Sequence, residues 1–217
     1  MPSMPFKSWS AAVTAEMIIL FARVVTAVRA IWDGVEPVAK KRVYFANHTS
    51  NGDFVLVWSV LPPHMRRRTR PVAAGDYWLT SRPKSFVGRE VFNAVLIDRN
   101  PDTRTEDPIA LMAEALDAGS SLILFPEGTR NTTDAPLLPF KSGLFHLATQ
   151  RPDVDLVPVW IENLSSVMPK GEVFPVPLLC TIRFGAAMWL QDGEDKDAFL
   201  ARTHAALLEL GESGETG

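Results

Sequence analysis

The stretch RVYFANHTSNGDFVLVWSVL, residues 42–61, decides the fold of this chain. Its first six residues form a short hydrophobic run, rich in aromatic and β-branched side chains, which predicts a buried strand. A polar turn follows, and residues 53–61 read as an apolar helix that begins at Asp53 and ends before Pro62. A strand that passes through a short turn into a helix is the building unit of α/β proteins.

The same alternation of strand and helix continues along the chain. Hydrophobic runs predict further strands at residues 70–75, 94–98, 120–125, 156–161 and 178–185. Helical periodicity predicts helices at residues 108–118, 140–150 and 195–210. We therefore expect an α/β domain over residues 35–217, with a mainly parallel, mixed sheet covered by helices on both faces.

The N-terminal segment, residues 1–34, contains the apolar stretch AAVTAEMIILFARVVTAVRAIW (residues 11–32). Charged residues interrupt this stretch, so it does not suit a membrane-spanning helix, which needs about 20 mostly apolar residues. At helical spacing the charges gather on one side and leave a wide apolar face. The pattern predicts an amphipathic helix that either packs on the protein's own core or associates with a membrane interface, and the sequence favours neither.

Composition limits the classes of partner. A chain of 217 residues with 47% hydrophobic residues can bury one sizeable core. Its formal net charge of -3 offers no overall attraction to nucleic acid, so we expect no nucleic-acid partner. The single cysteine, Cys180, cannot form an internal disulfide, so a reducing compartment is permitted.

Three polar clusters follow predicted strands. They are NHTSNGD (residues 47–53), the pair Asp98-Arg99, and PEGTR (residues 126–130). In a parallel sheet, ligands gather at the carboxyl ends of the strands, where loops lead into helices. We therefore expect the three clusters to lie along one edge of the sheet.

The first cluster holds His48 and Asp53. An aspartate that accepts the ring Nδ1–H fixes the tautomer, leaves Nε2 free as a base and stabilises the imidazolium. The simpler interpretation, and the commoner one for this spacing alone, is that His48 ends a strand and Asp53 caps a helix. The sequence has no Gly-x-Ser-x-Gly motif to supply a nucleophile, so a proton taken by His48 would come from a substrate hydroxyl or from water.

The other two clusters supply cations. Arg99 and Arg130 carry guanidinium groups that can fork onto a phosphate, and Lys141 adds a third positive charge. Gly128 lets the backbone approach a ligand closely, and Thr129 adds a hydroxyl group. Convergence of these residues would give a binding site for an anionic substrate group, whereas any one arginine alone is usually part of a solvated ion pair.

Taken together, the motifs NHxSxxD, Ile-Asp-Arg, FPEGTR, FKxG and Val-Pro-Val occur in this order between Asn47 and Val159. The series resembles the glycerolipid acyltransferase family, which includes the 1-acylglycerol-3-phosphate acyltransferases. The resemblance implies that His48 is the general base and Asp53 its partner. It also implies roles for residues further along the chain: acceptor binding by Arg99, Glu127, Gly128 and Arg130, and a border of the acyl-donor site at residues 157–159.

The resemblance implies an O-acyltransferase that moves a fatty acyl group from an acyl thioester to the hydroxyl of a lysophospholipid. The donor would be acyl-CoA or acyl carrier protein, with no metal or other cofactor. The enzyme would be peripheral or monotopic at the cytoplasmic face of a phospholipid membrane. Asn51-Gly52 stands where the family more often has bulkier residues, which leaves open a catalytically weak lipid-binding protein. A thioesterase-like hydrolase, in which His48 activates water, is a third alternative.

Overall fold

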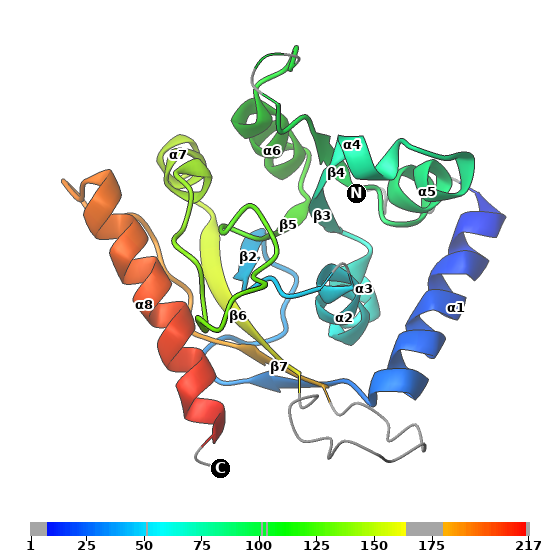
Figure 1. The fold of residues 1–217 in the computed structure, drawn as a ribbon, viewed down its shortest axis with the longest axis horizontal. Coiled ribbons are helices and arrows are strands. Elements are labelled where there is room, and N and C mark those ends of the chain that lie inside the picture. The colour runs from blue at the N-terminus through cyan, green and yellow to red at the C-terminus, as the bar shows by residue number, and fades with distance from the viewer. Residues whose placement is uncertain (1–7, 51, 101, 103, 164–179, 216–217) are drawn as a thin grey trace.

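The computed structural model describes residues 8–50, 52–100, 102, 104–163 and 180–215. Within these residues one sheet has the strand order β1-β7-β6-β2-β5-β3-β4 (Figure 1). Its strands are β1 (Arg29–Trp32), β2 (Arg42–Ala46), β3 (Thr69–Ala74), β4 (Val95–Ile97), β5 (Ser121–Leu124), β6 (Asp155–Asn163) and β7 (Cys180–Phe184). Only β6 and β7 pair antiparallel among these strands, which confirms the predicted mixed, mainly parallel sheet.

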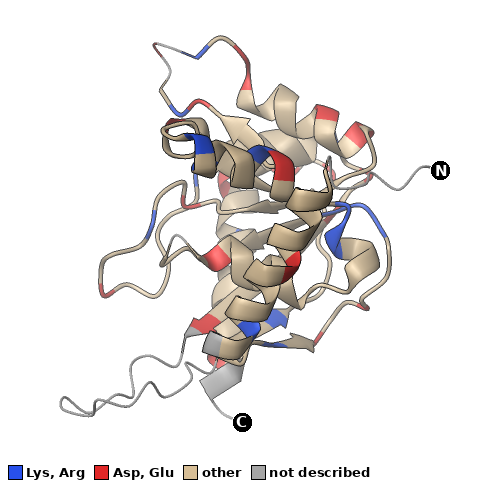
Figure 2. Cartoon of the chain, turned by 90° about the vertical axis from the view of Figure 1, so that its right-hand side faces the viewer, with Lys and Arg blue, Asp and Glu red and all other residues tan. Residues whose placement is uncertain are grey.

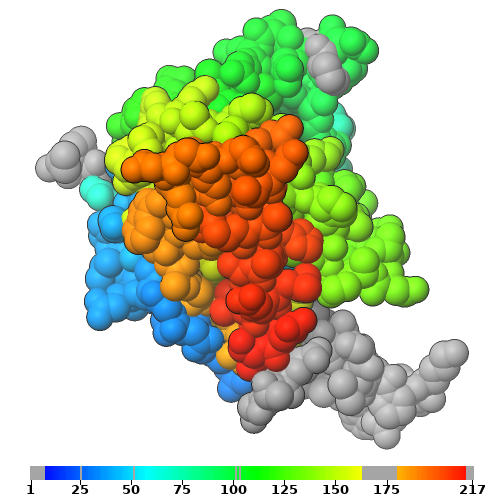
Figure 3. Space-filling view, turned by 90° about the vertical axis from the view of Figure 1, so that its left-hand side faces the viewer, coloured from blue at the N-terminus to red at the C-terminus, as the bar shows by residue number. Residues whose placement is uncertain are grey.

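Helices cover both faces of the sheet, as predicted. One face carries α1 (Trp9–Thr26), α2 (Asp53–Val60), α3 (Pro63–Arg66), α4 (Gly75–Trp78), α5 (Arg82–Phe86) and the π-helical turn η1 (Val87–Val91). The other face carries α6 (Pro108–Asp117), α7 (Gly143–Gln150) and α8 (Lys196–Glu215). Figure 3 shows α8 lying across the outside of this second layer.

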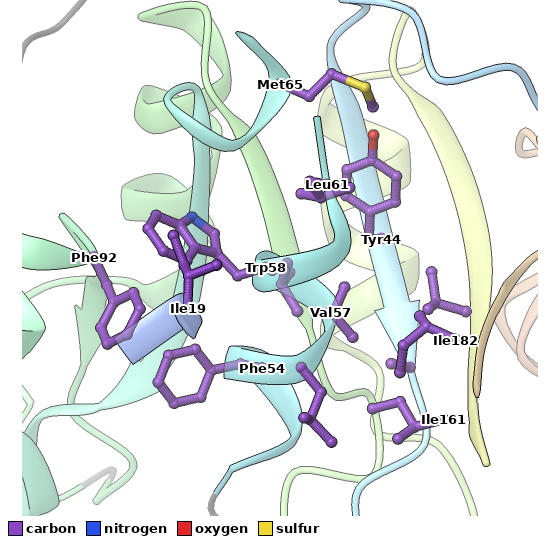
Figure 4. Close-up of a cluster of buried hydrophobic side chains, with 14 of the residues drawn as sticks. Ile19, Tyr44, Phe54, Val57, Trp58, Leu61, Met65, Phe92, Ile161 and Ile182 are labelled. Atoms are coloured by element: carbon purple, nitrogen blue, oxygen red, sulfur yellow. The ribbon is translucent and has the colours of Figure 1, made fainter. Parts of the chain in front are cut away.

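The alternation of side chains along β2 explains why a layer of helices packs on each face of the sheet. Tyr44 and Ala46 point into the cluster under α1 and α2, while Val43 and Phe45 point into the cluster under α6, α7 and α8. All of these side chains are fully buried. Figure 4 shows Tyr44 in the first cluster, with Trp58 and other side chains of α2 nearby. Burying a large apolar side chain stabilises a fold by about 1.5–3 kcal/mol, so central β2 anchors both layers.

The elements predicted from residue 42 onward are present, with some shifted ends. The helix predicted at residues 140–150 begins at Gly143, and the one predicted at residues 195–210 continues to Glu215. Residues 178–179, which begin the strand predicted at 178–185, lie outside the described residues. The short helical turns α3, α4, α5 and η1 were not predicted, because four or five residues do not give a periodic pattern.

The prediction that the first helix continues to Trp32 is wrong. Helix α1 ends at Thr26, where Ala27 takes a left-handed conformation with φ of 43°. Residues 29–32 instead form β1, which pairs in parallel with β7, and Trp32 stacks on Phe184 with 4.0 Å between ring centroids. Strand pairing and this stacking outweigh the local helical pattern. The division of the chain at residue 34 stays a prediction.

Helix α1 buries small residues and exposes large ones. It packs against α2 and η1, with Ala11, Ala15 and Ile19 in the shared cluster and Ala22 also buried. Its outer side presents Met17, Leu20, Phe21 and Val24 to the exterior, and Phe21 is 70% exposed. Of the described helices, none has both the length and the apolar character needed to cross a membrane.

Candidate active site

His48 follows the end of β2, and hydrogen bonds to its backbone N–H and to its carbonyl hold it in place. Its backbone N–H donates to Glu127 Oε1 at 2.7 Å, and its carbonyl accepts from the N–H of Asn131 at 2.6 Å. Because β2 and β5 are neighbours in the sheet, the loops that leave these two strands lie side by side. The first and third polar clusters of the sequence therefore meet at the carboxyl edge, as predicted.

Asp53 orients the His48 ring. Its Oδ2 lies 3.0 Å from His48 Nδ1, and the carboxylate is completely buried. The same oxygen accepts the backbone N–H groups of Thr49 and Ser50, at 2.6 and 2.8 Å, while Oδ1 accepts the Ser50 hydroxyl at 2.6 Å. These bonds fix the carboxylate at the first turn of α2, where the helix dipole also favours negative charge. Asp53 thus orients the ring and closes the turn as well.

The His48 ring is packed as well as hydrogen-bonded. It stacks on Phe125, with 4.2 Å between ring centroids and 21° between the planes. Its side chain remains 20% exposed. With Nδ1 directed at a buried carboxylate, Nε2 is the ring nitrogen left to meet a bound molecule. This arrangement can remove a proton from a hydroxyl group presented at the sheet edge.

Glu127 ties the two loops together. Its second oxygen, Oε2, accepts the backbone N–H of Leu138 at 2.9 Å, so both oxygens receive main-chain donors. The residue is only 2% exposed. Burial raises the pKa of the Glu127 carboxyl above its usual value, and the hydrogen bonds from Leu138 and His48 offset part of that rise. Glu127 thereby fixes the loop that follows β5. Its direct contact with an acceptor stays a prediction.

Gly128 and Lys141 are in contact beside this loop. Gly128 has φ of +69°, a conformation that favours glycine. A Cβ at this position would lie 2.7 Å from Lys141 Cδ, so the missing side chain makes room for the lysine. The backbone N–H of Lys141 donates to the Pro126 carbonyl at 2.8 Å and fixes the lysine beside this loop. Thr129 and Arg130 follow Gly128 and are exposed at the rim.

Arg99 lies apart from this cluster. It follows β4, and β3 stands between β4 and β5, so at a strand spacing of about 4.8 Å its strand is roughly 10 Å from β5. Its guanidinium donates to Asp76 Oδ2 at 2.7 Å, and both side chains are largely exposed. A shared anion site of Arg99, Arg130 and Lys141 stays a prediction.

Sequence reasoning missed three supporting residues. Phe125 forms the stacking surface, Ser50 bonds Asp53, and Asn47 exchanges two hydrogen bonds with Ile161 of β6 at 2.7 and 3.1 Å. Asn47 and Ser50 are fixed positions of the NHxSxxD motif, and Phe125 is the first residue of FPEGTR. Their place in these motifs was the signal that could have identified them as supporting residues. Asn51 lies outside the described residues.

The Val-Pro-Val element belongs to β6. Val157 and Val159 are fully buried in the cluster beneath α1 and α2. They support the sheet next to β2 from inside the core. The border with an acyl donor that the resemblance implies for this element stays a prediction.

The chain is similar in sequence to known proteins. Residues 30–162 match the family described as Acyltransferase. The 1-acyl-sn-glycerol-3-phosphate acyltransferase alpha of Mus musculus is 30% identical over 175 residues, which are 77% of this chain and 57% of that protein. The 1-acyl-sn-glycerol-3-phosphate acyltransferase of Salmonella typhimurium is 32% identical over 131 residues, 57% of this chain and 48% of that protein. The chain thus spans about half the length of the curated relatives it matches.

A solved structure shares the fold. The crystal structure of the 1-acyl-sn-glycerophosphate (LPA) acyltransferase PlsC from Thermotoga maritima aligns with a TM-score of 0.67 and 18% sequence identity, over 98% of this chain and 85% of that one. The family match covers more than half of the chain, and the motif order agrees with the resemblance drawn from the sequence. The chain belongs to the acyltransferase family that includes the glycerolipid acyltransferases.

Proposed function

We propose that this protein is an O-acyltransferase that moves a fatty acyl group from an acyl thioester to the hydroxyl of a lysophospholipid such as 1-acylglycerol-3-phosphate. The observation that carries the proposal is the 3.0 Å contact between His48 Nδ1 and the buried Asp53 carboxylate. The relatives named 1-acyl-sn-glycerol-3-phosphate acyltransferase support this choice of acceptor.

The proposed reaction is a direct transfer. His48 Nε2 takes the proton of the acceptor hydroxyl while that oxygen attacks the thioester carbonyl carbon. The tetrahedral intermediate then expels the thiolate, which receives the proton from the imidazolium. Asp53 stabilises the imidazolium through the interval between these steps. General-base assistance of this kind typically contributes about 10²–10⁴ in rate.

The donor is acyl-CoA or acyl carrier protein, and it enters as a substrate. The transfer as written uses proton movement and one nucleophilic attack, so the proposal includes no metal and no further cofactor. Phe125 contributes by holding the imidazole plane, since a ring stacked at 4.2 Å restricts rotation of His48. Correct orientation of base and acceptor is itself a large part of catalysis.

The acceptor phosphate is proposed to bind Arg130, with Lys141 as a second cation. Arg130 precedes Asn131, whose backbone N–H donates to the His48 carbonyl, so the backbone of Arg130 is held next to the loop that carries the base. It is exposed and forms no salt bridge within the described part of the chain. Arg99, by contrast, is already engaged by Asp76.

Arg130→Ala should raise KM for lysophosphatidic acid by about tenfold, as expected for one lost charge-assisted hydrogen bond. KM for acyl-CoA should stay within about twofold, because the guanidinium is assigned to the acceptor. Arg99→Ala should raise the acceptor KM less, because its guanidinium already pairs with Asp76. Steady-state kinetics with each substrate varied in turn measures both values, and equal losses for donor and acceptor would contradict the phosphate role.

The proposed reaction itself is tested by incubating the protein with acyl-CoA and lysophosphatidic acid. Formation of phosphatidic acid, followed by mass spectrometry, should match release of free thiol mole for mole. Thiol release without an acceptor would instead identify a hydrolase. Omitting lysophosphatidic acid is the matched control for that outcome.

We further propose that α1 attaches the protein peripherally to the surface of a phospholipid membrane, at the cytoplasmic face. The support is its outward row of large apolar side chains, because contiguous exposed apolar surface of this kind marks interaction sites. Phe21→Gln should weaken binding to neutral phosphatidylcholine vesicles about tenfold, the effect expected for one aromatic side chain withdrawn from the bilayer. Cosedimentation measures the change, with the exposed Val38→Gln as control; equal effects of both substitutions would exclude α1 as the contact.

A further inference from the structure

A cavity lies at the amino ends of the central strands, at the other end of the sheet from His48. It has a volume of 490 Å³ and opens between the amino ends of β2, β5 and β3. Because β2 runs from this cavity toward the candidate active site, the two are separated by the length of a five-residue strand, about 17 Å. The volume falls within the range of about 300–1,000 Å³ that is usual for small-molecule sites.

Positive charge surrounds this cavity. The basic residues that line it are Lys40, Lys41, Arg67, Arg68 and Arg70. None of the described residues in its lining is acidic. Its floor is apolar and is formed in part by Tyr44 and Met65. We call this site the basic cavity.

Part of this charge has no acidic partner. Lys40 pairs with Asp155 at 2.7 Å and Lys41 with Asp153 at 3.1 Å. Across the described chain, Arg67 and Arg68 make no salt bridge. Arg70 donates to the carbonyl oxygen of Asn93 at 2.6 Å and forms no salt bridge among the described residues, although the charge of Glu114 acts on it from outside the lining.

The backbone under the arginine run is fixed. The indole N–H of Trp58 donates to the carbonyls of Arg66 and Thr69, at 3.2 and 3.1 Å. The Arg68 carbonyl accepts the N–H of Ser121 at 2.7 Å, which attaches the run to the first residue of β5. Arg67 and Arg68 therefore extend from a loop held by β5 and by a buried tryptophan. A loop that is already fixed in its binding conformation loses less conformational entropy when a ligand binds than a flexible loop does.

The surroundings of Arg66 and Arg70 disfavour the charged forms of these two guanidinium groups. Burial lowers the pKa of the Arg66 guanidinium, and repulsion from Arg23 and Arg67 lowers it further, although Glu16 opposes the change. Burial also lowers the pKa of Arg70, with Glu114 opposing. Sites that gather cations without acidic partners are typical of anion recognition.

We propose that the basic cavity is a second binding site, separate from the catalytic cluster, for a phosphate group carried by a larger molecule. Arg67 and Arg68 supply forked donors and Arg70 a third positive charge, while the apolar floor accommodates part of the carrier. The carrier is either a lipid with a phosphate headgroup or a soluble phosphomonoester.

The position of the arginine run suits either source. Figure 2 shows Lys and Arg positions gathered on a loop beside α1, at the right of the view. A lipid headgroup could therefore reach the loop from a membrane that contacts the outer side of α1. A soluble phosphomonoester could enter directly, because Arg67 and Arg68 are exposed. The occupant of this cavity is independent of the chemistry at His48.

The first experiment uses soluble probes. Glycerol 3-phosphate and inorganic phosphate are titrated by calorimetry into the full chain and into Arg67→Gln/Arg68→Gln. The affinity should fall by about tenfold for each arginine removed, as expected for a charge-assisted hydrogen bond. The control is Arg89→Gln/Lys196→Gln, which removes the same charge from exposed positions outside the lining. Acyl transfer in detergent should be equal in all three proteins.

The second experiment uses vesicles of phosphatidylcholine with and without phosphatidic acid. A gain in binding with phosphatidic acid that disappears in Arg67→Gln/Arg68→Gln, but not in the control, identifies a lipid headgroup. If Arg67→Gln/Arg68→Gln loses affinity for glycerol 3-phosphate in the calorimetric titration but binds both kinds of vesicle as the control does, the ligand is a free phosphomonoester. If the double variant matches the control in both experiments, the basic cavity is not a phosphate site, whatever the acyl-transfer result.

Discussion

Replacing His48 by alanine should lower kcat for acyl transfer by about 10²–10⁴-fold, the range usual for loss of a general base. The substitution removes the ring nitrogen that takes the acceptor proton, while the backbone bonds from residue 48 to Glu127 and Asn131 can persist. The acceptor KM should change little, because the phosphate is assigned to Arg130 and Lys141. Initial rates of phosphatidic acid formation at saturating acyl-CoA measure the effect.

His146→Ala is the matched control, because His146 is exposed on α7 and belongs to the opposite layer. It should retain full activity. Thermal unfolding of both variants separates a chemical loss from a folding defect, since alanine at residue 48 also removes the stacking on Phe125. Unchanged thiol release by a folded His48→Ala protein would remove the imidazole from the mechanism.

The sequence predicted the strand–turn–helix unit because its signals agree with one another. Residues 42–46 form a strand that is buried on both faces, and four of its five side chains are hydrophobic. The exception is Arg42 at the start of the strand, whose guanidinium donates to the Glu36 carbonyl. Asp53 stands at the start of an apolar helix, where local capping and tertiary packing favour the same structure. The contact between His48 and Asp53 was one of two interpretations of this unit, and it could be considered from the sequence because both residues belong to one local turn.

Features that depend on distant residues could not be predicted. The end of α1 is decided by β7, which follows it by more than a hundred residues and recruits residues 29–32 into the sheet. The bonds of Glu127 to two backbone N–H groups depend on the path of two loops, so its carboxylate looked available to a ligand in the sequence. Strand order across the sheet does not follow chain order, so the sequence alone could not show that β3 stands between the strand before Arg99 and the strand before Arg130.

Replacing Asp53 by asparagine should reduce kcat by an amount on the order of 10²–10⁴-fold, with little change in the acceptor KM. The amide has the shape of the carboxylate, and its oxygen can still accept the N–H groups of Thr49 and Ser50. It carries no charge, so the imidazolium formed on His48 loses its stabilising partner. The effect therefore falls on the chemical step, and measurement of kcat and KM across acceptor concentrations resolves it.

Ser50→Ala separates this electrostatic role from support of the turn. It removes the Ser50 hydroxyl bond to Asp53 Oδ1 and leaves the contact between Asp53 Oδ2 and His48 in place. One such hydrogen bond is worth about 0.5–1.5 kcal/mol, so the cost should appear in the free energy of unfolding, with kcat lowered less than about tenfold. If Ser50→Ala and Asp53→Asn reduce kcat equally, the aspartate acts through the shape of the turn. A much larger loss in Asp53→Asn, at similar unfolding temperature, assigns its effect to the charge beside the imidazole.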